Sequence, residues 1–183
     1  MSDPARAAWR ARQGAGARHD APEAPAEALA LARRGRAYLA RIVNGLDDAA
    51  LWRMSVRPGW TRRRVIAATA LEARAIAQAL EDATGQPGDR ADTGAAALDL
   101  AETLPAPALR HLLAHAQIHL DVVWRDLGAA AWNGAAVLAD RTRSARETPL
   151  QHAATLWQAA FDLSAGARRR DLPAAIAPHL HRL

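Results

Sequence analysis

The sequence predicts an all-α domain, and three observations lead to this prediction. About a quarter of the residues are alanine, the residue with the strongest intrinsic preference for helix. Apolar residues recur every three to four positions over long stretches, which is the spacing that lines one face of a helix. Residues that favour strands are few, and only 4% of the chain is aromatic. With 183 residues, the chain is long enough for one domain with a hydrophobic core.

The composition also excludes several classes of site. The chain has no cysteine, so disulfides, thiol nucleophiles and cysteine-type zinc sites are ruled out. Charged residues interrupt every apolar stretch, and the N-terminus has no apolar core of a secretion signal, so we expect a cytoplasmic protein without a membrane partner. All 24 basic residues are arginine, and the net charge is +5. Because residues 61–84 lack the short turn of a helix-turn-helix, we expect no nucleic-acid partner.

The first predicted elements are an arm and a helix. Residues 1–25 combine prolines, glycines and alternating charges without apolar periodicity, which predicts a mobile N-terminal arm. The remaining residues, 26–183, form the predicted single domain. Its first helix runs from Glu27 to Asn44, where Gly45 supplies a stop signal. A short connecting helix follows, begun by Asp47 or Asp48.

The rest of the chain alternates long helices with connections. Thr61 is the predicted cap of a long helix that ends near Thr84. Residues 92–104 predict a short helix and residues 108–127 a long one with a clean apolar stripe. Residues 128–147 predict a long loop or hairpin, residues 148–165 the last helix, and the tail an irregular or short helical piece. The four long helices with short accessory helices indicate a four-helix bundle.

One segment carries a family resemblance. Pro58-Gly59-Trp60-Thr61, with Ser55 before it and Val65 after it, resembles the signature of mycothiol-dependent maleylpyruvate isomerases, which belong to the DinB-like four-helix metalloproteins. Ala131-Trp132, Leu156-Trp157 and Asp171-Leu172-Pro173 are similar to further points of that family. The resemblance covers residues 27 to 175 approximately and implies a DinB-like bundle.

The resemblance also implies where a metal would bind. The family holds a divalent metal, usually zinc, with one histidine on the second long helix and with a glutamate and a histidine four residues apart on the last. These positions fall on Ala68, Thr155 and Ala159. Alanine has no donor atom and a lone threonine hydroxyl is a poor zinc ligand, so we expect no metal and no cofactor here. Moving the last helix by one residue brings Gln158 or Ala160 into a ligand position and restores no ligand pair.

The first functional hypothesis is a non-catalytic binding protein. In this hypothesis the family's pocket persists as a cavity, and its ligand is a small thiol, an acidic metabolite or a protein partner. We expect such a chain to form a homodimer through its helix faces. The predicted pocket residues are Trp60, Ala68, Glu72, His152, Thr155, Ala159 and Asp162.

A second hypothesis is an enzyme, a thiol-dependent isomerase or transferase, and two versions of it stay open. Glu72 and His152 are candidates for a metal-independent acid/base pair, although the sequence favours a structural interpretation, a buried ion pair or a flank pair with Arg74 or Arg146. The other version is a relocated metal site. Its candidate ligands, four residues apart on one helix, are His111, His115 and His119, which a solvated surface also explains.

Two basic segments and the tryptophans complete the candidates. Arg62, Arg63 and Arg64 open a long helix, where the positive end of the macrodipole and free N–H groups favour an anion. Residues 168–170 form a second basic patch. A third hypothesis is a regulatory interaction protein, in which Trp9 of the predicted arm anchors a protein partner. The tryptophans at positions 60, 132 and 157 are predicted to pack in the core and its turns.

Overall fold

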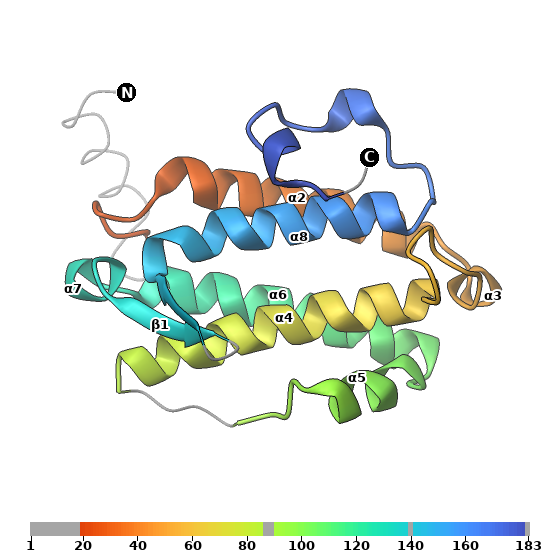
Figure 1. Ribbon diagram of the computed structural model, residues 1–183, viewed down its shortest axis with the longest axis horizontal. Coiled ribbons are helices and arrows are strands. Elements are labelled where there is room, and N and C mark those ends of the chain that lie inside the picture. The colour runs from red at the N-terminus through yellow and green to blue at the C-terminus, as the bar shows by residue number, and fades with distance from the viewer. Residues whose placement is uncertain (1–18, 86–89, 139–140, 182–183) are drawn as a thin grey trace.

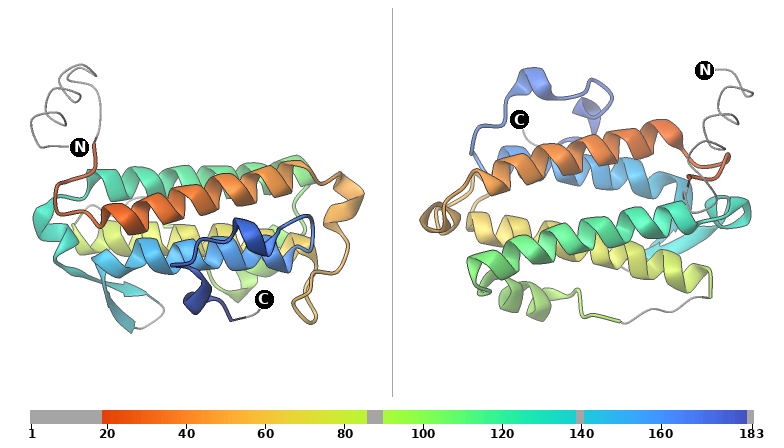
Figure 2. Two further views of the ribbon diagram at one scale, coloured as in Figure 1. Left: turned by 90° about the horizontal axis from the view of Figure 1, so that it is seen from above. Right: turned by 180° about the vertical axis from the view of Figure 1, so that it is seen from behind.

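Four long helices lie side by side in the computed structural model, which describes residues 19–85, 90–138 and 141–181. They are α2 (Ala26–Asn44), α4 (Arg62–Ala83), α6 (Ala106–Asp126) and α8 (Thr148–Asp162). Helices α2 and α8 run in one direction and α4 and α6 in the other (Figures 1 and 2). The connection from α4 to α6 therefore returns along the length of the molecule (Figure 1).

The short elements lie at the ends and sides of these helices. They are the helices α3 (Asp48–Leu51), α5 (Ala95–Glu102) and α7 (Ala129–Trp132), the strands β1 (Ala135–Leu138) and β2 (Arg141–Ser144), and the 3-10 turns η1 (Ala145–Glu147), η2 (Arg169–Asp171) and η3 (Ala177–His179). The prediction of a mostly helical domain is confirmed, but a purely α-helical class is wrong in one detail. Strands β1 and β2 pair antiparallel, with Ala135 opposite Ser144. Ala136 and Leu138 alternate inward and pack the hairpin on α4, which explains the strands.

Two helix starts form as the sequence predicts. The Asp47 side chain accepts a hydrogen bond from Ala50 N at 2.6 Å and caps α3. The Thr61 hydroxyl accepts one from Arg64 N at 3.1 Å and caps α4. Both caps satisfy an N–H group that has no partner inside the helix, so they fix where these helices begin.

Each long helix buries one face in a common core. Helix α2 packs mainly on α8, and α4 mainly on α6. Gly35 permits the first contact, because a Cβ at this position would lie only 3.0 Å from Trp157 Nε1. The fully buried side chains include Leu29, Leu39, Ile66, Ile76, Leu80, Leu109, Leu120, Trp132, Leu156 and Leu163. In the described part of the chain, no helix combines the length and the apolar character that a membrane span requires.

Part of the predicted mobile arm is packed. Asp20 forms a two-pronged ion pair with Arg33 on α2, both contacts at 2.7 Å, and Arg33 Nε donates to Asp121 on α6 at 2.7 Å. Ala24 is buried in the core. Residues 19–25 therefore belong to the folded domain, because a bidentate arginine pair and apolar burial offset the cost of ordering them. The rest of the predicted arm, including Trp9, lies outside the described residues.

Candidate functional site

A cavity of about 470 Å³ lies between α4 and α8, and we call it the α4/α8 cavity. Ala68 on α4 and Ala154 and Ala159 on α8 line it. Because these side chains end at Cβ, the facing helices leave a volume that larger residues fill elsewhere in the core. Small-molecule sites occupy about 300–1,000 Å³, so the cavity has the size of a ligand site.

Most of the predicted pocket residues line this cavity. They are Ala68, Glu72, Thr155, Ala159 and Asp162. Two predicted pocket residues, Trp60 and His152, do not line it. Trp60 instead stacks with Arg57, whose guanidinium carbon lies 3.3 Å from the ring centre. His152 precedes Thr155 by three residues, which turns its side chain by about 60° around α8 and into the core.

Glu72 is the centre of a hydrogen-bonded network that joins three helices. Thr155 Oγ1 donates to Glu72 Oε1 at 2.8 Å, and His152 Nδ1 lies 3.2 Å from Glu72 Oε2. On the other side of the ring, His152 Nε2 lies 2.8 Å from Gln117 Oε1 on α6. We call these four side chains the Glu72 network. It ties α4 to α8 and α6.

His152 is the most enclosed member of the Glu72 network. Its side chain is 0% exposed, whereas that of Glu72 is 26% exposed and reaches the cavity. Both ring nitrogens of His152 have a partner, Nδ1 in Glu72 and Nε2 in Gln117, so the ring is held between α4 and α6. Trp124 closes the remaining edge of the ring, with the two ring centres 6.0 Å apart. His152 therefore orients Glu72, and Glu72 is the group that a ligand in the cavity can touch.

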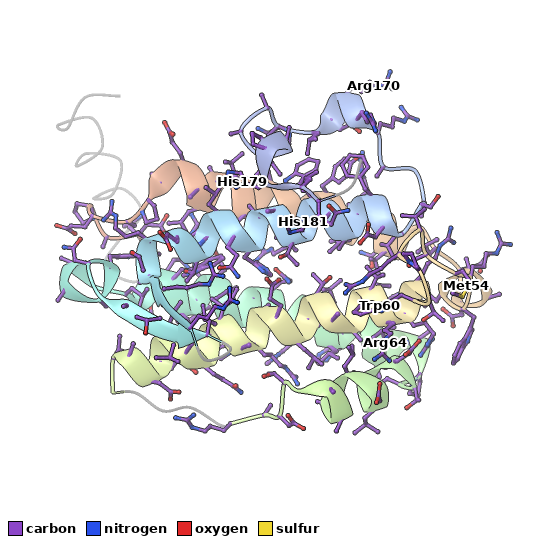
Figure 3. All side chains as sticks on the ribbon, viewed as in Figure 1. Met54, Trp60, Arg64, Arg170, His179 and His181 are labelled. Atoms are coloured by element: carbon purple, nitrogen blue, oxygen red, sulfur yellow. The ribbon has the colours of Figure 1, made fainter. Side chains whose placement is uncertain are left out.

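The C-terminal segment covers one side of the cavity. His179 and His181 line it from this segment, which crosses the outer side of α8 (Figure 3). The backbone N–H of His181 donates to Gln158 Oε1 at 3.0 Å, and Gln158 Nε2 donates to Asp162 Oδ1 at 2.8 Å. Ile176 is fully buried and anchors the segment. The cavity wall thus combines two carboxylates with basic side chains.

Several contributors to this site are absent from the sequence predictions, among them Gln117, Arg143, His179 and His181. Gln117 had a detectable signal, because it interrupts the apolar stripe of α6 between Leu113 and Leu120. A polar residue on a buried helix face needs a partner there. The other three reach the cavity from strand β2 and the tail, which no local pattern places against α8.

Arg63 holds the end of α5 and does not face an anion site. Its side chain is only 2% exposed. Arg63 Nε donates to the carbonyl oxygen of Glu102 at 2.7 Å, and Nη2 donates to that of Leu104. The guanidinium also stacks over Trp52, and burial lowers the pKa of Arg63. The carbonyl groups at the C-terminus of a helix lack partners within it, so this arginine satisfies them.

The other two arginines of the cluster have separate partners. Arg62 donates to the carbonyl oxygens of Ala50 at 3.2 Å and Ser164 at 2.9 Å. Arg64 forms an ion pair with Glu102 at 2.9 Å. Figure 3 shows Arg64 beside Trp60 at the start of α4. All three guanidinium groups are bound to oxygen atoms of the protein, and the anion site at this helix end stays a prediction.

The histidines of α6 form a column on the surface. The ring centres of His111 and His115 lie 6.0 Å apart, and those of His115 and His119 lie 6.5 Å apart. His119 Nε2 contacts Glu81 Oε1 at 2.9 Å. Within the described residues, no group of three or more histidine, aspartate or glutamate side chains is arranged to hold a metal ion.

The positions implied for a metal by the family resemblance converge in the cavity. Ala68, Thr155 and Ala159 all line it, from the two facing helices α4 and α8. Together they offer one hydroxyl and neither an imidazole nor a carboxylate. The Thr155 hydroxyl already donates to Glu72. Zinc takes histidine nitrogen, carboxylate oxygen or thiolate ligands, so these three residues do not fit the family's metal.

Comparisons with known proteins identify the family of this chain. The family model described as the mycothiol maleylpyruvate isomerase N-terminal domain matches residues 32–165. A solved mycothiol-dependent maleylpyruvate isomerase is 31% identical, with a TM-score of 0.75 over 84% of this chain and 66% of that chain. A histidine-to-alanine mutant of such an isomerase gives the same values. No curated protein sequence matches. The chain thus spans about 66% of the length of these isomerases, and it belongs to the mycothiol maleylpyruvate isomerase N-terminal domain family.

Proposed function

We propose that this domain binds a small acidic or thiol-containing metabolite in the α4/α8 cavity without a divalent metal, and that it does not catalyse a metal-dependent isomerisation. One observation carries the proposal. The three positions implied for the metal meet in one cavity, and their residues are Ala68, Thr155 and Ala159. The cavity persists although the ligand set does not fit a metal.

The Glu72 network supports this proposal. In the family resemblance, the metal is the group that joins the second long helix to the last. Here Glu72 joins the same two helices through Thr155 and His152. A hydrogen-bonded carboxylate can hold α4 against α8 when no metal does so. The network thus gives the cavity a fixed wall.

The charges around the cavity support an acidic ligand. Arg57, Arg143, His179 and His181 contribute to the wall, against the two carboxylates Glu72 and Asp162. Arginine binds carboxylates with two parallel hydrogen bonds. The solved relatives are described as acting on maleylpyruvate with mycothiol. A ligand related to either compound is therefore the first to test.

The first experiment measures zinc in protein that carries no histidine tag. We expect less than about a tenth of an equivalent of zinc, and no rise in melting temperature when zinc is added, because an ion at one hundred times its dissociation constant would add about 2.7 kcal/mol. The His115→Ala variant removes the centre of the α6 histidine column and controls for surface binding. One equivalent of zinc that persists in His115→Ala would overturn the proposal.

The matched experiment restores the ligands. The triple variant Ala68→His/Thr155→Glu/Ala159→His places two imidazoles and a carboxylate on the cavity wall. We expect it to bind one equivalent of zinc and to melt at a higher temperature with zinc than without. The double variant Thr155→Glu/Ala159→His is the control, and we expect weaker binding from it. Failure of the triple variant to bind would show that these positions are not equivalent to the metal ligands.

The ligand experiment titrates mycothiol and maleylpyruvate separately into the wild-type protein by isothermal calorimetry. We expect saturable binding of at least one of them, and at least tenfold weaker binding by Ala68→Leu, which fills the cavity. The exposed α5 residue gives the matched control Ala96→Leu, which should bind as wild type. No binding of either compound would reject a ligand of this class.

A second candidate function is a metal-independent enzyme, and the exposure of Glu72 to the cavity favours it. Here Glu72 would take and return a proton of the ligand while His152 and Thr155 hold the carboxylate in place. The test measures isomerisation of maleylpyruvate with mycothiol after metal removal. Turnover that Glu72→Gln reduces by at least about a hundredfold, with binding unchanged, would favour the enzyme over the binding protein.

A further inference from the structure

Arg143 brings an unpaired positive charge to the α4/α8 cavity. It lies on β2 directly opposite Ala136 of β1, and residues directly opposite each other in a strand pair share one face of the hairpin. Ala136 is buried where the hairpin packs on α4, so Arg143 lies on the inner face and lines the cavity (Figure 1). Arg143 is half-buried, and among the described residues no group forms a hydrogen bond or an ion pair with its guanidinium.

A ligand carboxylate is the natural partner of this guanidinium. A charge that is partly withdrawn from water is unfavourable unless an opposite charge pairs with it. The planar guanidinium matches the two oxygens of a carboxylate with parallel hydrogen bonds. The other arginine of the cavity wall, Arg57, is already stacked on Trp60, with its guanidinium carbon 3.3 Å from the ring centre. We therefore assign the acidic end of the ligand to Arg143.

Two carboxylates on the cavity wall can accept further hydrogen bonds. Thr155 donates to Oε1 of Glu72, and His152 lies 3.2 Å from Oε2. Gln158 donates to Oδ1 of Asp162 at 2.8 Å. An ionised carboxylate has about four acceptor positions, so these partners leave positions that a ligand can use. Glu72 is the more accessible of the two, because 26% of its side chain is exposed.

These charges do not match a ligand that is negative at every end. A carboxylate bound to Arg143 would share the cavity with Glu72 and Asp162, and like charges in one cavity repel each other. An ammonium group on the same ligand would compensate this repulsion. It offers three donors to the carboxylate oxygens. The positive group comes from the hairpin and the negative groups from α4 and α8, so the wall is complementary to a ligand with two opposite ends.

We propose that the α4/α8 cavity binds a dipolar amino acid, whose carboxylate pairs with Arg143 and whose ammonium group donates to Glu72. This inference rests on the proposed function, because it names the class of acid that the same cavity takes. The volume of about 470 Å³ leaves room for a chain of several atoms between the two charged ends.

The test titrates glycine, β-alanine, γ-aminobutyrate and ε-aminocaproate into the wild-type protein by isothermal calorimetry. Each amino acid has two matched analogues: the acid that lacks the ammonium group and the amine that lacks the carboxylate. We expect saturable binding of at least one amino acid, and binding at least about tenfold weaker for both of its analogues. The proposal would be overturned if no amino acid of the series saturates the protein at about 10 mM, or if the acid analogue binds equally well.

Two variants assign the two ends of the ligand. We expect Arg143→Gln to weaken binding of the amino acid at least about tenfold, and Glu72→Gln to reduce the preference for the amino acid over its acid analogue to less than about twofold. Arg141→Gln is the matched control, because Arg141 lies on the same strand but is exposed and outside the cavity wall. Equal binding by the Arg143 and Arg141 variants would overturn the proposal. Arg143 has no described partner to lose, so its variant should fold and decides the outcome even if Glu72→Gln unfolds.

Mycothiol and maleylpyruvate, titrated under the same conditions, separate this inference from the proposed function. Binding of either compound that Ala68→Leu abolishes, together with no binding of any amino acid, would overturn the inference and keep the proposed function. No binding of any of these compounds would overturn both. Binding of an amino acid that is lost in Ala68→Leu supports the inference, whereas binding that Ala68→Leu leaves unchanged would place the ligand outside the cavity and overturn it.

Discussion

Two polar regions of this molecule, the Glu72 network and the arginines at the start of α4, use their charges in opposite ways. In the first region, Glu72 is hydrogen-bonded to Thr155 and His152 but keeps 26% of its side chain exposed toward a cavity. In the second region, Arg63 is almost completely buried against backbone carbonyl groups. The carboxylate is available to a ligand, and the guanidinium is not.

The difference teaches that a cluster of charge in a sequence does not by itself identify a binding site. The arginine cluster is the more conspicuous of the two, yet its donors are used by Ala50, Ser164 and the end of α5. Glu72 is an isolated acidic residue of α4. It becomes a site residue because alanines around it leave space. A charged side chain can bind a ligand when there is space beside it and when its hydrogen-bonding atoms are not all used by the protein.

The largest expected effect is in the Glu72 network. His152→Ala removes a fully buried ring, leaves Gln117 Oε1 without its contact and leaves the Glu72 carboxylate with Thr155 as its remaining hydrogen-bond partner in the network. We expect a loss of about 3–5 kcal/mol in the free energy of unfolding, measured with urea at pH 7. A double-mutant cycle with Glu72→Gln separates the pair from the packing. A loss below about 1 kcal/mol would mean that the network is not formed.

The next effect tests whether Arg63 is structural. Arg63→Ala leaves the carbonyl groups of Glu102 and Leu104 without these donors, so we expect a loss of about 2–3 kcal/mol in the free energy of unfolding. Arg63→Lys should not restore it, because an ammonium group lacks the planar fork. Arg53→Ala, an exposed arginine ten residues earlier, is the control. Equal stability of the Arg63 and Arg53 variants would return Arg63 to the candidates for anion binding.

A smaller effect on the free energy of unfolding is expected from the partly exposed ion pair of Asp20 with Arg33. The hydrogen bond from Arg33 lowers the pKa of Asp20. A lowered pKa in the folded state means that the stabilisation is present above the unfolded value of about 3.9 and is lost as the pH falls through the folded value. We expect about 1 kcal/mol, seen as a weaker acid dependence of the unfolding free energy in Arg33→Ala.

An acid dependence that is identical in wild type and Arg33→Ala would show that residues 19–25 are not held as described. Asp20→Asn is the matched control. It removes the titrating group and keeps Arg33, so it should flatten the same part of the pH profile.

The smallest effect is expected at the exposed end of the arginine cluster. Arg64 pairs with Glu102 and Asp99, and Asp99 is 67% exposed. We expect Arg64→Ala to lower the melting temperature less than Arg63→Ala, and the difference from wild type to disappear in about 1 M sodium chloride, where screening extends over about 3 Å. A salt-independent loss as large as that of Arg63→Ala would remove the distinction between the two arginines.

Much of the fold could be predicted because its signals are local. Asp47 and Thr61 begin helices as expected, since a cap acts within three residues of itself. For residues 128–147 the sequence predicts either a loop or a hairpin, and the structure has the hairpin of β1 and β2. Strands of four residues such as these are too short to show a clear alternation of apolar and polar residues. The sequence predicts that His152 pairs with Glu72, and the two side chains are in contact. It also predicts His152 on the pocket wall, but the ring lies behind that wall, because its place depends on the rotation of α8 in the bundle.

The amino-acid sequence by itself determined the helices, their starts and the faces that they bury, because these depend on residues within a few turns of one another. The tertiary structure decided which polar groups meet. Glu72 and His152 are 80 residues apart, and Arg63 reaches a carbonyl group 39 residues away. Such contacts depend on how rigid helices pack against one another. That packing is set by the residue volumes at positions such as Gly35 and Ala68, and the neighbouring sequence does not reveal which distant residues they contact.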